Sequence, residues 1–119
     1  MVRFGSKAPQ MIPNPAATLL VNRAARGVGA TFPAERLRAY LRRHGIETLV
    51  EFPDSPLAMT RAASSAANRG DALLFVAGGD GTLRVAAEGI ESSDTALAAL
   101  PLGTVNGWAR EVDTTLPTY

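Results

Sequence analysis

The sequence predicts an α/β fold, namely a three-layer domain with an open, mostly parallel sheet and helices on both faces. Two observations lead to this prediction. Short apolar runs alternate with helix-like segments along the chain, and the links between them are short. The run ALLFVA at 72–77 is wholly apolar, as a strand in the middle of a parallel sheet should be. Alternation of this kind implies parallel strands joined by right-handed crossovers.

The composition limits the possible functions. The chain has 119 residues, the size of a single domain. The lack of cysteine excludes disulfide scaffolds and Cys-based zinc sites, and a single histidine, His44, excludes histidine-rich metal centres. A net charge of +1 offers no electrostatic reason to expect nucleic acid as a partner. No apolar run approaches the roughly 20 residues of a membrane span.

The first half of the chain alternates strand, helix and strand. Residues 17–22 (ATLLVN) form an apolar run closed by polar residues, which predicts a buried strand. A helix is expected over 31–44, with Pro33 in its first turn and Gly45 at its end. Residues 46–52 (IETLVEF) alternate apolar and polar, which predicts a half-exposed strand near an edge of the sheet.

A second helix is expected to begin at Ser55, whose hydroxyl caps it, with Pro56 at the first helical position. It runs to about Asn68, and Gly70 ends it. Small apolar side chains are expected to face inward and let this helix lie close to the sheet: Ala58, Ala62, Ala63, Ala66 and Ala67.

The second half repeats the alternation. The strand at 72–77 leads directly into a glycine-rich turn, and a helix is expected from about Thr82 to Glu88. The apolar stripe of that helix comprises Leu83, Ala86, Ala87 and Ile90. A short strand at 96–101 and a last helix near 105–111 complete the pattern. Ligands of open α/β sheets bind at the carboxyl ends of strands, so the Gly-Thr turns after the last two strands are expected at one edge.

The glycine-rich turn, Gly78-Gly79-Asp80-Gly81-Thr82, predicts a phosphate site. Three glycines in four positions are not expected from packing, because glycine costs about 0.5–1 kcal/mol relative to alanine in regular structure. They are expected where the backbone has positive φ or where a ligand approaches it closely. Free amides at a helix N-terminus favour phosphate, and Thr82 adds a hydroxyl donor. The alternative is a turn that is merely tight.

Asp80 is unusual in a phosphate-binding turn, because a carboxylate repels phosphate. It either reaches a bridging Mg²⁺, which prefers oxygen ligands, or caps the turn through its own backbone. The turn is neither the dinucleotide-binding fingerprint nor the P-loop, because the spacing differs and no lysine follows.

The segments LLFVAGGDGTL and ALAALPLGTVNGWAR together resemble the catalytic domain of diacylglycerol kinases and of the related sphingosine and bacterial lipid kinases. The GGDG turn is shared with NAD kinases and phosphofructokinases, whereas the block PLGTVN singles out the lipid-kinase branch. The segment LLVNRAARGVG at 19–29 looks like the opening strand and turn of that family. The resemblance covers about residues 17–117.

The resemblance implies a kinase that transfers the γ-phosphoryl group of ATP to a lipid hydroxyl with Mg²⁺. It implies a set of nucleotide-binding residues, with Asp80 as the candidate metal ligand and no catalytic residue assigned: Asn22, Gly78, Gly79, Asp80, Gly81, Thr82, Gly103, Thr104 and Asn106. The chain departs from the family pattern at three places. Arg84-Val85 replaces the usual Asn-Glu, Gly107 replaces an aspartate, and Arg23 replaces a proline. Arg84 either adds positive charge near the site or lies on a solvated helix face.

The domain expectation follows from the same resemblance. Residues 1–15 are expected to form a loose arm and 16–119 the nucleotide-binding domain, without the β-rich lipid-binding domain of the family. The chain by itself is therefore expected to be inactive and to self-associate near Trp108. A cytoplasmic location is expected for a different reason, because the sequence has neither a signal-peptide pattern nor cysteine. The arginines of the first helix form either a solvated face or a contact with anionic membrane: Arg36, Arg38, Arg42 and Arg43. The alternative functions are an NAD-kinase-like small-molecule kinase and a non-catalytic nucleotide-binding or dimerisation module.

Overall fold

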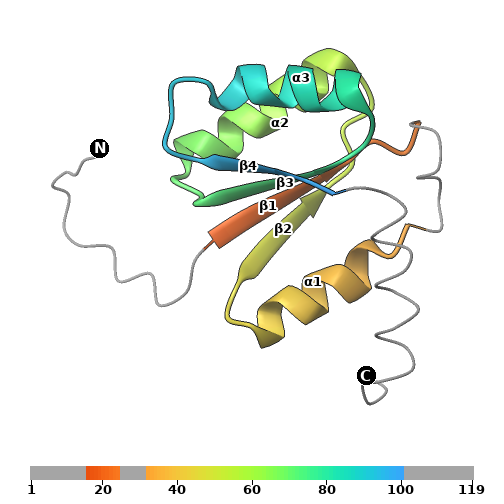
Figure 1. Cartoon of the computed structure of the whole chain (residues 1–119), viewed down its shortest axis with the longest axis vertical. Coiled ribbons are helices and arrows are strands. Elements are labelled where there is room, and N and C mark those ends of the chain that lie inside the picture. Colours follow the sequence, from red (N-terminus) through yellow and green to blue (C-terminus); the bar gives the residue numbers. More distant parts are fainter. Residues whose placement is uncertain (1–15, 25–31, 101–119) are drawn as a thin grey trace, which may run out of the picture.

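A parallel sheet lies between two layers of helices (Figure 1). The computed structural model describes residues 16–24 and 32–100. Within these residues the strands are β1 (Ala16–Val21), β2 (Glu47–Glu51), β3 (Leu73–Ala77) and β4 (Ala96–Ala99), in the order β2-β1-β3-β4. The helices are α1 (Ala34–Arg43), α2 (Pro56–Asn68) and α3 (Asp80–Ile90). Helix α1 covers one face, and α2 and α3 cover the other (Figure 1), which confirms the predicted fold class.

The two central strands carry the core. Leu20 of β1 lies beside Val76 of β3, and both pack against α2 and α3. The adjacent Leu19 faces the opposite side, toward α1. Strand β2 lies at an edge, as predicted, but its burial does not follow the polarity of its residues, because the polar Thr48 is buried and the apolar Leu49 is exposed.

The helix boundaries follow the capping residues. The Ser55 hydroxyl accepts a hydrogen bond from the Ala58 amide at 3.0 Å, and Pro56 occupies the first helical position, as predicted. Gly45 and Gly70 follow α1 and α2 with φ of +83°, a conformation that side chains other than glycine rarely adopt. Helix α1 begins at Ala34 rather than at 31. Pro33, predicted in its first turn, instead precedes the helix with ψ of 57°, which is outside the helical range.

Helices α2 and α3 approach each other closely. A β-carbon on Gly89 would lie 2.5 Å from the carbonyl oxygen of Thr60, so only glycine fits there. The Thr60 hydroxyl donates a hydrogen bond to the Val85 carbonyl across the same interface at 2.9 Å. Ala63 is fully buried, as predicted, and Met59 joins the same core although the sequence did not single it out.

Helix α3 begins two residues earlier than predicted. Gly79 precedes it in an extended conformation, so Asp80, Gly81 and Thr82 form its first turn. The predicted start at Thr82 was therefore wrong, because the glycines of the motif are compatible with the beginning of the helix as well as with a loop. The helix reaches Ile90, past the predicted end.

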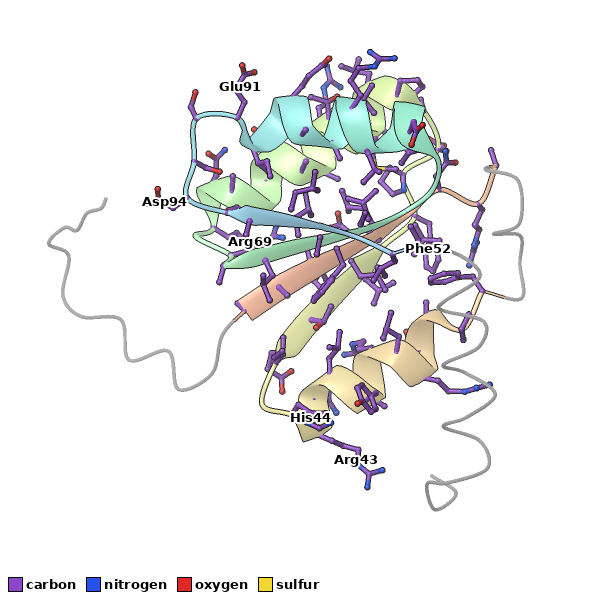
Figure 2. All side chains as sticks on the ribbon, in the orientation of Figure 1. Arg43, His44, Phe52, Arg69, Glu91 and Asp94 are labelled. Atoms are coloured by element: carbon purple, nitrogen blue, oxygen red, sulfur yellow. The ribbon has the colours of Figure 1, made fainter. Side chains whose placement is uncertain are left out.

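A buried polar network closes the sheet at the edge where its strands begin. The Thr18 hydroxyl donates to the Asp71 carboxylate at 2.5 Å, and Arg69 donates to the Thr18 hydroxyl at 2.8 Å. The Thr95 hydroxyl donates to the Asp71 carbonyl oxygen at 2.7 Å. Figure 2 shows Arg69 on this side of the sheet, away from Phe52. The network connects β1 to the residues that precede β3 and β4.

The structure bears on some of the remaining expectations and leaves others as predictions. The predicted last helix, with Trp108, lies outside the described residues. On α1, Arg38 forms an ion pair with Glu35 at 3.1 Å, and Arg42 with Glu47 at 3.5 Å. Membrane contact and self-association remain predictions. Within the described part of the chain, every helix is too short or too polar to cross a membrane.

Candidate functional site

The candidate site lies at the edge where the parallel strands end. Strands β1 and β3 are neighbours, and Val21 lies beside Ala77 as their last paired residues. The amide of Asn22 extends this pairing by donating to the Ala77 carbonyl at 3.0 Å. The sheet therefore places Asn22 next to Gly78, as the topology argument predicted for the ends of neighbouring strands.

Asn22 and Thr82 hold each other directly. The side-chain nitrogen Nδ2 of Asn22 donates a hydrogen bond to Oγ1 of Thr82 at 2.8 Å. The Asn22 Oδ1 atom accepts from the Ala24 amide at 3.0 Å, which fixes the orientation of the carboxamide. Thr82 is buried, and its hydroxyl still has a hydrogen to donate. The contact thus ties the end of β1 to the first turn of α3.

The three glycines of the motif differ in whether neighbouring atoms leave room for a side chain. A β-carbon on Gly78 would lie 2.8 Å from atoms of the Thr82 side chain, so packing explains this glycine. A β-carbon on Gly79 or Gly81 would meet no atom of the described residues within 4 Å. None of the three has positive φ. The expectation that packing explains none of them was therefore wrong for Gly78, because the Thr82 side chain folds back against it.

The amino end of α3 has free hydrogen-bond donors. Gly79 precedes the helix and provides no side-chain cap, and the first helical hydrogen bond is donated by Leu83 to the Gly79 carbonyl. The amides of Asp80, Gly81 and Thr82 therefore have no hydrogen-bond acceptor among the described residues. Free amides and the positive end of the helix dipole favour an anion at this position.

A cavity of about 430 Å³ adjoins this end of α3. It lies between the end of β1, the segment that enters α2, and the first turns of α3. Its lining comprises Asn22, Ala24, Pro53, Asp54, Ser55, Pro56, Met59, Gly81, Thr82, Arg84 and Val85. Three predicted residues, Asn22, Gly81 and Thr82, therefore share one cavity. Gly78, Gly79 and Asp80 adjoin it along the chain but do not line it.

The contribution of the segment before α2 was missed by sequence reasoning. Asp54 and Ser55 line the cavity although neither was predicted as a site residue. A signal was present, because Ser55 and Pro56 were identified as a helix start. In a parallel α/β sheet, helices begin at the edge where the strands end, so this helix start belongs to the same edge as the glycine-rich turn.

Among the described residues that line the cavity, the charged groups are one arginine and one aspartate. Arg84 and Asp54 both line it, and no ion pair joins them. The structure therefore places Arg84 beside the cavity, on an exposed part of α3. Asp80, the candidate metal ligand, is exposed in the first turn of that helix. Among the described residues, no three His, Cys, Asp or Glu side chains are grouped so that they could hold a metal by themselves.

The second predicted motif lies outside the described residues. Gly103, Thr104 and Asn106 belong to it, as does the departure at Gly107. Their expected place beside the glycine-rich turn remains a prediction.

Comparison with known proteins identifies the family of the chain. The family model for the diacylglycerol kinase catalytic domain matches residues 16–118, which include every strand and helix described above. A search of curated proteins gave no significant match. The family match and the observed parallel three-layer fold identify the chain as a member of the diacylglycerol kinase catalytic domain family.

Proposed function

We propose that this chain binds the phosphates of ATP at the first turn of α3 and serves the transfer of the γ-phosphoryl group to a lipid hydroxyl. The family match supports a lipid-kinase-like function. The nucleotide assignment depends on one observation, the open surroundings of Gly79 and Gly81 beside the free amides of α3. Neither has a backbone conformation or a neighbour that requires glycine, and both lie where helix amides are free.

The geometry fits a phosphate chain for a physical reason. A phosphate oxygen can accept hydrogen bonds from backbone amides only if the ligand comes within about 3 Å of the main chain. A side chain at Gly79 or Gly81 would occupy that space, and glycine leaves it open. The adjoining cavity of about 430 Å³ is within the size range of small-molecule sites.

The residues present also fit a magnesium ion that accompanies the nucleotide. In kinases, Mg²⁺ is commonly held by one or two carboxylates together with the substrate phosphates, so a three-residue cluster is not required. Asp80 would hold it from the first turn of α3, together with the phosphates of the nucleotide. When bound, the ion neutralises phosphate charge.

The role of this chain in the reaction is to position and stabilise the phosphates. Phosphoryl transfer needs little covalent chemistry from the protein and depends on alignment and on stabilisation of charge. The free amides of α3 would bind phosphate oxygens. The Asn22–Thr82 hydrogen bond at 2.8 Å fixes the end of β1 against the same turn, so the site is held in place before a ligand arrives.

Replacement of Gly81 by alanine tests the nucleotide assignment. Gly81 lies in the first turn of a helix with open space around it, so Gly81→Ala should stabilise the free protein. The added methyl group should at the same time weaken nucleotide binding. We expect thermal melts to show a higher Tm without ligand and a smaller shift with several-millimolar Mg-ATP. Equal Mg-ATP shifts in wild type and variant would contradict the assignment.

The bulkier variant Gly79→Val should remove the Mg-ATP shift altogether. For the wild type, ATP at ten times Kd should add about 1.4 kcal/mol to the free energy of unfolding. Valine accepts the extended backbone observed at this position, so the variant should still fold. A wild-type protein that shows no shift with Mg-ATP would refute the proposed function.

The acceptor is tested separately. Labelled ATP is offered with diacylglycerol in micelles and, in a parallel reaction, with NAD. We expect any phosphate transfer to favour the lipid. Preferential transfer to NAD would support the small-molecule-kinase alternative. Nucleotide binding without transfer to either acceptor is the result expected of this chain by itself, and it would agree equally with a non-catalytic nucleotide-binding module.

A further inference from the structure

Arg84 is the one cationic side chain among the described residues that line the cavity. It lies one helical turn after Asp80, on the side of α3 that faces the segment entering α2. It makes no hydrogen bond or ion pair with the described residues. The resemblance implies asparagine at this position, where this chain has arginine.

The direction of helical side chains brings Arg84 toward the free amides. Side chains of an α-helix lean toward its amino end, so a long side chain covers the turn that precedes its own position. For Arg84, the preceding turn contains Gly81, whose amide is free and which lines the same cavity. An anion at that amide is therefore within the region that the guanidinium can reach.

Most other described arginines already have a partner. Arg38 and Arg42 pair with glutamates, Arg69 pairs with Asp71 at 3.4 Å, and Arg23 stacks on the Phe52 ring at 3.8 Å. Arg84 instead lines a cavity whose other charged side chain, Asp54, does not pair with it. A cation in this position, close to free amides, provides the donor set that binds phosphate through two parallel hydrogen bonds.

We infer that Arg84 is a phosphate-binding residue of this cavity and that it favours ligands with a polyphosphate chain over ligands with a single phosphate. The inference rests on the proposed function for the identity of the nucleotide, but its chemistry requires only a polyphosphate. The amides of the first turn of α3 bind one phosphate group. The guanidinium binds the next group along the chain, which a monophosphate lacks.

The test measures dissociation constants for Mg-ATP, AMP and inorganic tripolyphosphate by calorimetry on the full chain. The variants are Arg84→Gln and Arg84→Lys. The matched control is Arg61→Gln, because Arg61 is an exposed arginine on α2 that does not line the cavity. Unfolding curves without ligand check that each variant is folded.

We expect Arg84→Gln to weaken Mg-ATP and tripolyphosphate binding about five- to tenfold, the range for a charged hydrogen bond partly open to water. Binding of AMP should change less than twofold, and Arg61→Gln should behave as wild type. Arg84→Lys should recover part of the loss, because it keeps the charge but not the planar pair of donors. High salt should reduce the difference between wild type and Arg84→Gln.

The outcomes separate this inference from the proposed function. Equal Mg-ATP affinities in wild type and Arg84→Gln would overturn the role of Arg84 and leave the nucleotide site intact. Arginine-dependent binding of tripolyphosphate without binding of ATP would support the role of Arg84 and refute the nucleotide. The absence of binding by all three ligands would overturn both. Equal losses of affinity in Arg84→Gln and Arg61→Gln would show that only the net charge of the protein matters, which would overturn the role of Arg84.

Discussion

The edge of the sheet where its strands begin (the first edge) and the edge where they end (the second edge) are built in opposite ways. At the edge where the strands begin, the polar groups are paired: Asp71 is buried and accepts from Thr18 and Arg69. At the edge where the strands end, the first amides of α3 have no acceptor among the described residues, and a cavity of about 430 Å³ adjoins them. The first edge serves stability, and the second retains unsatisfied donors that a ligand can use.

The glycines show the same contrast. Gly45 and Gly70, at the first edge, have φ of +83° and are required by the backbone of the protein itself. Gly79 and Gly81, at the second edge, have ordinary φ and open surroundings. Under the proposed function, the phosphates of the nucleotide occupy the space that Gly79 and Gly81 leave open. Substitutions can test this difference, and their effects on stability are expected to be largest at the first edge and smallest at the second.

The largest effect is expected from Asp71→Ala. The variant leaves the buried Thr18 hydroxyl without its acceptor and removes the contact of Arg69 with the carboxylate, although Arg69 still donates to the Thr18 oxygen. The free energy of unfolding should therefore fall by about 2–4 kcal/mol. Urea unfolding measures the change. Asp71→Asn, which keeps one acceptor oxygen and the shape, should lose clearly less. A loss below about 0.5 kcal/mol for Asp71→Ala would mean that this network contributes little.

Gly89→Ala should have the next largest effect, because it tests close packing away from either edge. The added β-carbon would lie 2.5 Å from the Thr60 carbonyl oxygen and would force α2 and α3 apart. We expect a loss of about 1–3 kcal/mol in urea unfolding, the usual range for overpacking. The matched control is Gly81→Ala on the same helix, which meets no neighbour. Similar losses in both variants would point to helix position rather than to contact with α2.

Replacement of glycine by alanine should change stability in opposite directions at the two edges. Gly70→Ala places a β-carbon on a residue with φ of +83° and should destabilise by about 1 kcal/mol. Gly81→Ala replaces a helical glycine in open space and should stabilise by about 0.5–1 kcal/mol. Thermal melts of the two variants side by side measure both changes. Two shifts of equal sign would remove the distinction drawn between the edges.

The smallest change in stability is expected from Thr82→Val. The variant removes the acceptor of the Asn22 Nδ2 donor, but Asn22 lines the cavity, where water can replace the lost partner. We expect a loss of about 0.5 kcal/mol or less, together with a weaker Mg-ATP shift in the melt. A loss of stability as large as that of Asp71→Ala would show that water does not reach the polar groups of the second edge.

Local signals in the sequence predicted most of the elements. The Ser55-Pro56 cap and Gly70 define α2 almost to the residue, because a hydroxyl cap, an early proline and a left-handed glycine act through the backbone next to them. The alternation of residues 46–52 placed β2 at an edge for a similar reason. The start of α3 was missed because glycine residues are compatible with both a loop and a first helical turn.

The sequence by itself determined the α/β class, the glycine-rich turn after β3 and the family of the chain, because each depends on short runs of adjacent residues. The tertiary structure decided which residues share a site. It placed Asp54, Ser55 and Arg84 around the same cavity as Asn22, and it paired Asn22 with Thr82 across sixty positions of sequence. It also separated Gly78, where a β-carbon would clash with Thr82, from Gly79 and Gly81, where a β-carbon would meet none of the described residues. Such contacts depend on the order of strands in the sheet and on the approach of helices, and neither is encoded in any one segment of the chain.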